Sequence, residues 1–530
     1  MTEEHPSRRD FLKLGTSALG CLALADSGTK ATAAKPPGAK AVVENVILII
    51  SDTLRRDAVS LYGSKWIETP HLDRFAQQAV IFENALVSSF PTVLARNDIL
   101  TGRYTFTYKG WQPIDSEDVT LPGILSKAGI LTSLISDTRH PYAPGFNYQR
   151  DFDAWDVTRG QEVDRYRSAP REVKLPCSPQ KLRDDGAAVI QHMRNVAHRN
   201  SEEDYFAPQT MIKAAKWLEQ NNDGRRFFLH VDTFDPHEPW DPPRYYVERF
   251  DPGYVGEEVV YPRYDRWREF LSEKELQHCR ALYAGEVTMV DRWVGFFLDR
   301  VATLGLLRNT AIIFMSDHGY YLGEHGYIGK SLIREDAHQN LPLYPTITRI
   351  PMLIYFPGCQ GGLRLKALVQ PVDLMPTVLD LLGVPKPPVI ESVSLAPLLE
   401  GRVTKVKDIA VSSPVIYYKN LPPWQATRVP PSPDSRSSIT DGEWLLVYGP
   451  NPEGTKGVAA TAAVDSKIRI VGHAQGEIRP ELYNLIEDPH CQVNLIGEKH
   501  NVARDFCSTY IDFLKDHKVP ASQMQYFRQI

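Results

Sequence analysis

A series of short, continuous apolar runs constrains the fold of this chain more than any other feature of its sequence. The runs cover residues 46–50, 131–135, 227–231, 311–315 and 352–356. Runs of this kind are typical of buried strands in a parallel sheet. Helical stretches separate them, at 120–128, 204–220 and 273–304. Strands and helices in alternation predict an α/β fold, with a mainly parallel central sheet flanked by helices.

Polar residues with metal-binding or acid–base chemistry follow some of these runs directly. Asp52 follows the first run, residues 232–237 follow the third, and Asp317-His318 follow the fourth. Ligands of such sheets bind beyond the carboxyl ends of the strands, so we expect these side chains to share one site. A carboxylate beside an imidazole at a strand end can hold a divalent cation. Taken alone, an Asp-His pair is more often part of a turn.

Charge and composition exclude several classes of protein. The formal net charge of −5 argues against nucleic-acid binding driven by bulk charge. A hydrophobic share of 42% excludes wholesale disorder. No apolar run after the N-terminus reaches transmembrane length, so we expect no membrane-spanning segment. The 6 cysteines include no CxxC pair, which argues against a zinc knuckle or a thioredoxin-type redox pair.

Residues 1–34 have the order of a removable export signal. Residues 7–13, Ser-Arg-Arg-Asp-Phe-Leu-Lys, resemble the twin-arginine motif. A mildly apolar stretch follows at 14–25, and small residues follow at 31–34. This order predicts export by the twin-arginine machinery and a periplasmic or secreted protein.

The remaining chain is expected to form two parts. The first, residues 40–385, contains the apolar runs and is expected to be the catalytic domain, whereas residues 386–530 begin among prolines and continue with short strands. We predict a smaller C-terminal subdomain from 386 to 530, with strands at 444–448 and 467–471 and a helix at 501–517. Residues 156–200 and 250–270 are polar and weakly periodic, which predicts surface insertions that shape substrate access.

The motifs together resemble the sulfatase family of the alkaline phosphatase superfamily. The segments that carry the resemblance span residues 44 to 496 in the family's order, namely Asp52, 69–75, 235–240, 283–291, 316–319, 322–330, 373–379 and 481–485. The resemblance implies an alkaline-phosphatase-like α/β sandwich with a smaller α+β subdomain at the C-terminus. It also implies metal-dependent hydrolysis of sulfuric or phosphoric esters.

The segment that should hold the nucleophile departs from the family pattern. Sulfatases carry C/S-x-P-x-R before a Thr-Gly pair, and the Cys or Ser is oxidised to formylglycine. Counting back from Thr101-Gly102 gives Thr92 as the nucleophile and Arg96 as the family arginine. The competing register starts at Ser89 but places Val93 at the arginine position. We favour Thr92, which by the same count matches the threonine nucleophile of the nucleotide pyrophosphatase/phosphodiesterase branch.

The resemblance and the strand-end chemistry together predict one divalent metal ion, Ca, Mn or Zn, in each chain. The predicted ligands are Asp52, Thr92, Asp317 and His318. The alternative adds a second metal at Asp232, Asp235 and His237, with His473 as a further candidate ligand.

Three further residues are predicted to act on the transferred group. Arg96 is expected to direct its guanidinium at a tetrahedral oxyanion. Lys330 and His237 resemble the family's groups around the transferred sulfuryl or phosphoryl, and His237 is expected to protonate the leaving oxygen. Weaker candidates for substrate binding, each with a plainer structural interpretation, are Thr53, His140 and His325.

The single hydroxyl of Thr92 bears on the reaction. Formylglycine hydrate has two hydroxyls and can release sulfate by collapsing to the aldehyde, whereas a threonyl ester has to be opened by water. The mechanism therefore leans towards phosphate mono- or diesters or phosphonate esters, with a small-molecule or glycan ester as substrate. A true sulfatase of a sulfated glycan, a non-catalytic anion-binding protein and a transferase to an alcohol acceptor are the alternatives.

Overall fold

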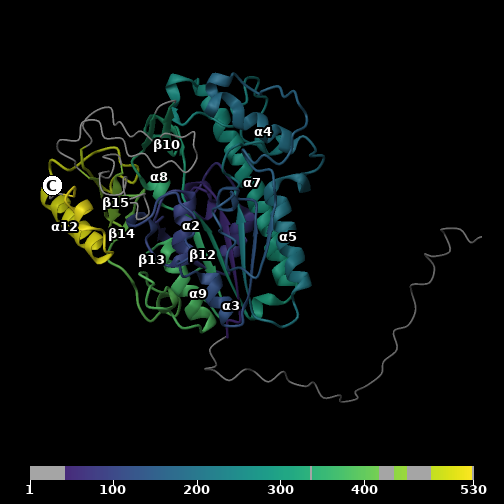
Figure 1. Cartoon of the computed structure of the whole chain (residues 1–530). Helices are drawn as coiled ribbons and strands as arrows, with labels where there is room; N and C mark the ends of the chain where they lie inside the picture. The colour runs from purple at the N-terminus through teal and green to yellow at the C-terminus, as the bar shows by residue number, and fades with distance from the viewer. Residues whose placement is uncertain (1–41, 335–336, 417–434, 451–478, 528–529) are drawn as a thin grey trace, which may run out of the picture. The chain divides into compact units, whose positions relative to one another are not determined.

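An 8-stranded sheet lies at the centre of the computed structural model, which describes residues 42–334, 337–416, 435–450, 479–527 and 530. Its strand order is β13-β2-β12-β7-β1-β5-β3-β4. The strands are β1 (Asn45–Ser51), β2 (Val80–Ala85), β3 (Leu131–Ser136), β4 (Ala154–Val157), β5 (Phe227–Thr233), β7 (Thr310–Ser316), β12 (Met352–Tyr355) and β13 (Arg364–Val369). Apart from β12, neighbouring strands run parallel, which confirms the predicted α/β sheet (Figure 1).

Strand β12 differs from the prediction, because it runs antiparallel to both β7 and β2. The reason lies in the connection that precedes it. Just past the end of β7, the backbone N–H of Gly319 donates to Ile347 O at 2.8 Å. The chain is therefore still at the carboxyl edge of the sheet shortly before β12 begins. Without a crossover to the other edge, the next strand can only run in the opposite direction.

Helices cover both faces of this sheet, as the strand–helix alternation predicts (Figure 1). Alternate residues of β1 enter two different cores: Ile47 and Ile49 pack in one, and Val46, Leu48 and Ile50 in the other. The first core includes residues of α1, α5 and α7, and the second includes residues of α2, α3 and α9. These helices are α1 (Pro70–Ala76), α2 (Thr92–Thr101), α3 (Leu121–Lys127), α5 (Phe206–Gln220), α7 (Glu273–Thr303) and α9 (Leu374–Leu382).

A small antiparallel sheet of 4 strands, in the order β14-β15-β16-β17, follows near the C-terminus. Helix α12 packs on it, because its buried residues share a core with Ile439 and Leu446. The elements are β14 (Ala410–Ser412), β15 (Ser437–Thr440), β16 (Trp444–Tyr448), β17 (Glu481–Asn484), α10 (Ala396–Leu399), α12 (His500–Asp516) and α13 (Ala521–Met524). This confirms a smaller C-terminal α+β part, while its start at residue 386 stays a prediction.

Shorter elements complete the described structure. They are α4 (Ala187–Val196), α6 (Arg244–Val247), α8 (Pro345–Thr348), β6 (Asp265–Arg266), β8 (Tyr321–Leu322), β9 (Tyr327–Gly329), β10 (Ser331–Arg334) and β11 (Ala337–Asn340). None of the helices in the described ranges is long and apolar enough to cross a membrane. The predicted export signal, the predicted strand at 467–471 and His473 lie outside the described residues.

The two predicted insertions contact each other. The backbone N–H of Arg183 donates to Tyr261 O at 3.1 Å, and that of Arg263 donates to Lys181 O at 3.0 Å. The side chain of Arg183 is only 13% exposed. Part of the polar region at 156–200 is therefore buried rather than spread over the surface.

Gly319 supplies a test of the close approach between the segment that follows β7 and the segment that precedes β12. A Cβ at this position would lie 2.0 Å from the backbone oxygen of Thr346, which cannot turn away as a flexible side chain can. We expect Gly319→Ala to lower the free energy of unfolding by ~1–3 kcal/mol, measured by urea denaturation. Gly497→Ala is the control, because a Cβ there would meet nothing within 4 Å. Equal changes in the two variants would contradict the close approach.

Candidate active site

Three carboxylates lie together at the carboxyl edge of the central sheet. Asp52 follows β1, Asp317 follows β7, and Asp232 lies near the end of β5, opposite Ile50 in the register. All three residues are fully buried. The backbone N–H of Thr53 donates to Asp317 Oδ1 at 2.9 Å and so ties the end of β1 to the end of β7. Parallel pairing of the central strands thus places three acidic groups side by side.

The guanidinium of Arg96, also fully buried, engages all three carboxylates. Its Nε and one terminal nitrogen donate to the two oxygens of Asp232 at 2.8 and 2.7 Å. The other terminal nitrogen donates to Asp317 Oδ2 at 2.6 Å and lies 3.1 Å from Asp52 Oδ2. This differs from the expected orientation towards an oxyanion. Arg96 holds the acidic side chains in place. Buried carboxylates without a positive partner would be costly, so the guanidinium uses its donors on them rather than keeping them for an oxyanion.

Thr92 is the first residue of α2 and is fully buried. Its Oγ1 lies 3.2 Å from His318 Nε2 and 3.3 Å from Lys330 Nζ. The free N–H groups at a helix N-terminus, together with the helix dipole, favour a negative charge at this position. The structure therefore brings Thr92 together with two other predicted site residues.

Ser89, the alternative nucleophile, is engaged elsewhere. Its hydroxyl donates to Asp98 Oδ1 at 2.8 Å and accepts from the backbone N–H of Phe106 at 3.0 Å. Asp98 also accepts from the backbone N–H groups of Ser89 and Thr105, each at 2.8 Å. Ser89 thus fixes the turn before α2, a local structural role.

Asp52, Asp317 and His318 offer ligand atoms that all lie within 4.8 Å of one another. Asp52 Oδ2 is buried and, among the described residues, accepts no hydrogen bond despite its nearness to Arg96. His318 Nδ1 lies 2.9 Å from Gly319 O and donates to it, so the lone pair of the ring is on Nε2, which faces Thr92 and Lys330. These donors fit a divalent cation, since carboxylate oxygen and imidazole nitrogen both bind such ions.

The electrostatics of this group favour the same conclusion. Burial and the neighbouring Asp317 raise the pKa of Asp52. The positive groups near this carboxylate therefore do not fully offset the cost of its negative charge. Burial and the Lys330 ammonium lower the pKa of His318 to about 3, which keeps its imidazole neutral, as a metal ligand must be. A divalent cation between the two carboxylates would offset their repulsion.

The carboxylates suggested for a second metal have other partners. Asp232 binds Arg96 and also accepts from Thr138 Oγ1 at 2.9 Å. Asp235 accepts from Gln161 Nε2 at 2.8 Å and from the backbone N–H of Ala207 at 3.2 Å. In the described part of the chain, the only group with metal-ligand spacing is Asp52, Asp317 and His318.

His237 and Lys330 form a contact pair next to Thr92. Lys330 Nζ lies 3.0 Å from His237 Nε2 and 3.4 Å from His318 Nε2. His237 Nδ1 lies 2.6 Å from Glu238 O and donates to it, so Nε2 is the acceptor for the ammonium. Burial and Lys330 together hold the pKa of His237 well below its usual range. This shift favours the neutral imidazole, whose one N–H hydrogen is donated to Glu238 O; the role of His237 as the acid stays a prediction.

A buried network behind His237 was not predicted from the sequence. Glu238 Oε2 lies 3.2 Å from His237 Nδ1, and Arg183 lies 3.4 Å from Glu238 and 2.8 Å from Glu162. The guanidinium of Arg183 also stacks over Tyr264, with 4.5 Å to the ring centroid. Arg183 and Glu162 belong to the predicted insertion at 156–200. Nothing in that polar, weakly periodic segment distinguishes these two residues from solvent-exposed ones.

The weaker candidates have different surroundings. Thr53 Oγ1 donates to Asp52 Oδ1 at 2.6 Å, and its φ of 64° is unusual for a β-branched residue. Thr53 therefore orients metal-site carboxylates. His140 Nε2 lies 3.3 Å from Glu162, with a ring-centroid distance of 5.2 Å to Trp111. His325 packs against Tyr344 at 4.3 Å between ring centroids.

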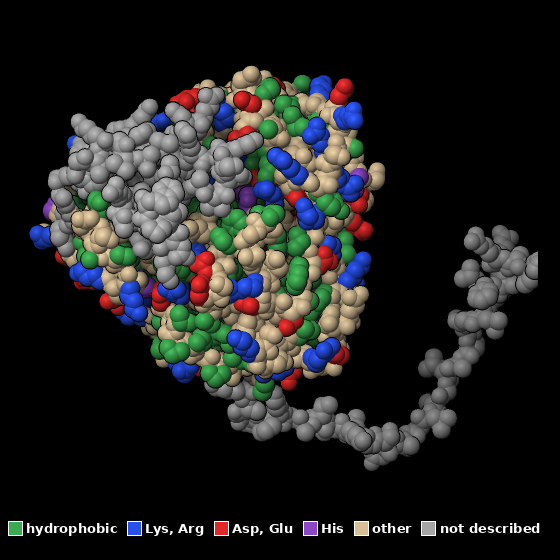
Figure 2. Space-filling view, viewed as in Figure 1, with side chains coloured by type: hydrophobic (Ala, Val, Ile, Leu, Met, Phe, Trp, Pro, Cys, Tyr) green, Lys and Arg blue, Asp and Glu red, His purple; other side chains and the backbone are tan. Residues whose placement is uncertain are grey.

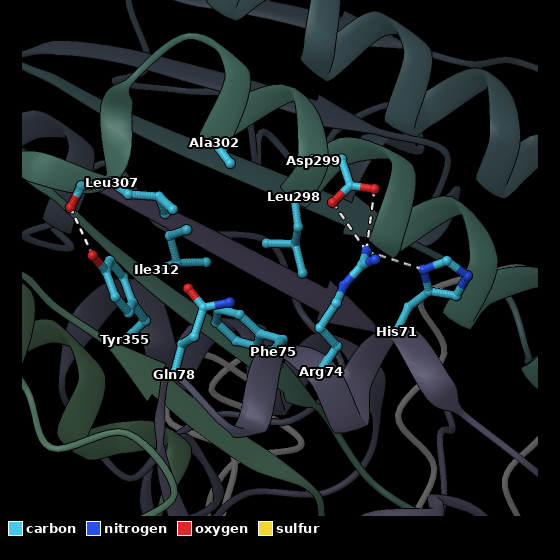
Figure 3. Close-up of a pocket in the computed structure, with 10 residues that line it drawn as sticks. All are labelled: His71, Arg74, Phe75, Gln78, Leu298, Asp299, Ala302, Leu307, Ile312 and Tyr355. Atoms are coloured by element: carbon cyan, nitrogen blue, oxygen red, sulfur yellow. Dashed lines mark hydrogen bonds and ion pairs between the residues drawn. The ribbon is translucent and has the colours of Figure 1, made fainter.

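A separate small pocket lies between α1 and α7, as Figure 3 shows, and contains no predicted site residue. Arg74 beside it is held by Asp299 at 2.9 Å. On the face seen in Figure 2, basic and acidic side chains are interspersed rather than gathered by sign.

Comparisons with known proteins identify the family of this chain. The family model described as Sulfatase matches residues 44–384, so the chain belongs to the sulfatase family. An arylsulfatase from Clostridium perfringens is 26% identical over 415 residues, which cover 69% of this chain and 80% of that enzyme. The chain is thus identified as an ester hydrolase of this family.

Two solved structures share the fold. A phosphonate monoester hydrolase from Agrobacterium radiobacter superposes with a TM-score of 0.66 at 18% identity, covering 89% of this chain and 96% of that one. A protein in complex with its substrate D-glucosamine-2-N,6-O-disulfate superposes with a TM-score of 0.63 at 19% identity, covering 91% and 99%. The same architecture therefore occurs in proteins described with phosphonate and with sulfate substrates.

Replacement of Arg96 tests its place among the carboxylates. Arg96→Lys retains the charge but cannot reach three carboxylates, so we expect the free energy of unfolding to fall by roughly 3 kcal/mol in urea denaturation. The control is Arg244→Lys, because Arg244 pairs with Glu248 on the surface and its side chain is 76% exposed. A loss no larger than that of the control would contradict the proposed role of Arg96.

The metal site is tested separately by elemental analysis. We expect Asp317→Asn to lower the divalent metal retained after dialysis by ~10-fold or more, because one of two charged ligands is lost. Asp299→Asn, which changes a surface carboxylate paired with Arg74, should retain metal as the unaltered chain does. Full metal retention by a folded Asp317→Asn variant would remove Asp317 from the site.

Proposed function

We propose that this chain hydrolyses monoanionic phosphodiesters or phosphonate monoesters, with Thr92 as the nucleophile. The observation that carries the proposal is the position of Thr92 Oγ1 at the start of α2, between His318 Nε2 and Lys330 Nζ. A hydroxyl so placed faces a neutral imidazole, an ammonium and the N–H groups of a helix terminus. These are the surroundings in which a hydroxyl can act on an anionic ester.

Asp52, Asp317 and His318 would hold the metal ion, with Thr92 beside it. When bound, such an ion lowers the pKa of a neighbouring hydroxyl and draws negative charge from the transferred group. Arg96 keeps the carboxylates fixed, and the N-terminus of α2 favours the anion. Lys330, an ammonium in contact with Thr92, is placed to donate a proton to the leaving oxygen.

The charge of the site supports a monoanionic substrate. Asp52, Asp232 and Asp317 contribute three negative charges, and Arg96 and Lys330 contribute two positive ones. A divalent metal ion would leave one net positive charge among these buried side chains. Because unpaired buried charge is costly, a singly charged ester matches this balance better than a dianionic phosphate monoester.

Phosphorus is favoured over sulfur by the nucleophile itself. Thr92 has one hydroxyl, so its adduct cannot collapse to an aldehyde and has to be opened by water. The second candidate is a sulfate ester, also a monoanion, and the match to an arylsulfatase favours it. In that case the natural substrate would be a sulfated glycan.

A panel of aryl esters tests the proposal. We expect turnover of an aryl phosphodiester or an aryl phosphonate to fall by at least ~10³-fold in Thr92→Ala and to persist in Thr92→Ser. Aryl phosphate, the dianion at pH 8, should be the poorest substrate of the panel. A dominant Thr92-dependent rate on aryl sulfate would instead establish sulfate esters as the substrates.

Ser89→Ala is the matched control for the competing register. We expect it to lower stability by about 1–2 kcal/mol, because Asp98 and Phe106 lose a hydrogen-bond partner, while the nucleophile remains. Activity lost in Ser89→Ala but retained in Thr92→Ala would exchange the two roles. A folded, metal-loaded chain with no turnover on any ester would support an anion-binding protein.

A further inference from the structure

We infer that His237 is the general base that activates water to open the ester formed on Thr92. This inference rests on the proposed function, because it concerns the second half of a reaction that begins with Thr92. A threonyl ester needs such a group, since water at neutral pH is a weak nucleophile and the adduct has no internal route to release.

The tautomer of His237 provides the base. Because Nδ1 donates its hydrogen to Glu238 O at 2.6 Å, Nε2 carries a lone pair. That nitrogen faces Lys330 Nζ at 3.0 Å, and the same Nζ lies 3.3 Å from Thr92 Oγ1. One ammonium thus separates the lone pair from the nucleophile. A water molecule that attacks a group carried by Thr92 would be within reach of this nitrogen.

The other groups at the site are less suited to this task. His318 Nε2 points at the metal-ligand cluster and would be occupied by the ion. Lys330 is an ammonium with three donors and no lone pair in the resting site; it becomes an amine only after it has protonated the leaving oxygen, and it then receives the proton that His237 takes from water. Asp232 and Asp317 accept hydrogen bonds from Arg96. Among the described residues in contact with Thr92 or Lys330, His237 therefore offers an imidazole lone pair, whose partner in the resting site is the Lys330 ammonium and which is released when Lys330 gives up its proton.

Neighbouring side chains hold the imidazole of His237 in place, and a nearby carboxylate can stabilise its protonated form. Its ring stacks on Phe234 with 4.0 Å between ring centroids. Glu238 Oε2, which accepts no hydrogen bond within the described structure, lies 3.2 Å from Nδ1 and can stabilise the imidazolium. Arg183 and Tyr264 fix the Glu238 side chain from the other side. The network from the predicted insertion thus serves as a support for the base.

The proton balance closes over the two steps. In the first step, Thr92 Oγ1 bonds to phosphorus, the bond to the leaving oxygen breaks, and Lys330 protonates that oxygen, while the hydroxyl proton of Thr92 passes to solvent. In the second step, water oxygen bonds to phosphorus and the bond to Thr92 Oγ1 breaks. His237 Nε2 takes the water proton and passes it to the Lys330 amine, and Thr92 Oγ1 regains a proton from solvent.

The test is His237→Asn with an aryl phosphonate whose leaving group departs without protonation. The Asn amide retains the contact to Glu238 O but removes the base. We expect a burst of about one equivalent of aryl alcohol, followed by a steady rate ~10²–10⁴-fold below that of the unaltered chain. Intact-protein mass spectrometry should show the phosphonyl adduct, and peptide analysis should place it on Thr92.

Two controls accompany this variant. The double variant Thr92→Ala/His237→Asn should show neither burst nor adduct. His278→Asn changes another buried histidine, which lies 3.0 Å from Asp251, and should turn over without accumulating adduct. If His237→Asn does not fold, as judged by near-UV circular dichroism, His237→Gln replaces it in the same measurement.

The outcomes separate the inference from the function on which it rests. A folded, metal-loaded His237→Asn that loses the burst and the steady rate alike, with no adduct, would overturn the inference and place His237 in the first step. An adduct that forms and clears at the unaltered rate would also overturn it. Turnover that survives Thr92→Ala would instead refute the proposed function.

Discussion

The contact of the Arg96 guanidinium with three buried carboxylates is the interaction on which the rest of this site depends. Asp52, Asp232 and Asp317 come from three neighbouring parallel strands and would repel one another in a medium of low dielectric constant. Arg96 neutralises much of this charge. Because it belongs to α2, the same contact fixes the helix whose first residue is Thr92. The acidic edge of the sheet and the nucleophile are thus held by one side chain.

The sequence predicted the parts of this arrangement that follow from chain pattern. Buried strands are apolar and end in polar residues at one edge, so the pattern alone is enough to place Asp52 and Asp317-His318 together. The distance from Thr92 to Thr101-Gly102 is fixed by helix geometry, and the structure places Thr92, not Ser89, beside His318 and Lys330. The direction of β12 could not be predicted, because its apolar run is the same whichever way the strand points.

Side-chain pairing was the harder part. The sequence suggested Arg96 for an oxyanion and Asp232 for a metal, yet the two bind each other across 136 positions in the chain. His237 was expected as an acid, but burial and Lys330 hold its pKa well below its usual range, which favours the neutral imidazole. Arg183 and Glu162 come from a polar segment with no periodic signal. Each of these differences concerns a partner that lies far away in sequence, which local pattern does not specify.

The long separations between partners also bear on how the protein acquires its metal. Thr53 and Asp317 are 264 positions apart, and Arg96 and Asp317 are 221 apart. Such contacts form only after long loops close, so the ligand cluster is completed late in folding. A chain in which these loops have not closed would hold the carboxylates apart. Metal binding by this cluster would therefore require the completed fold rather than a local segment of the chain.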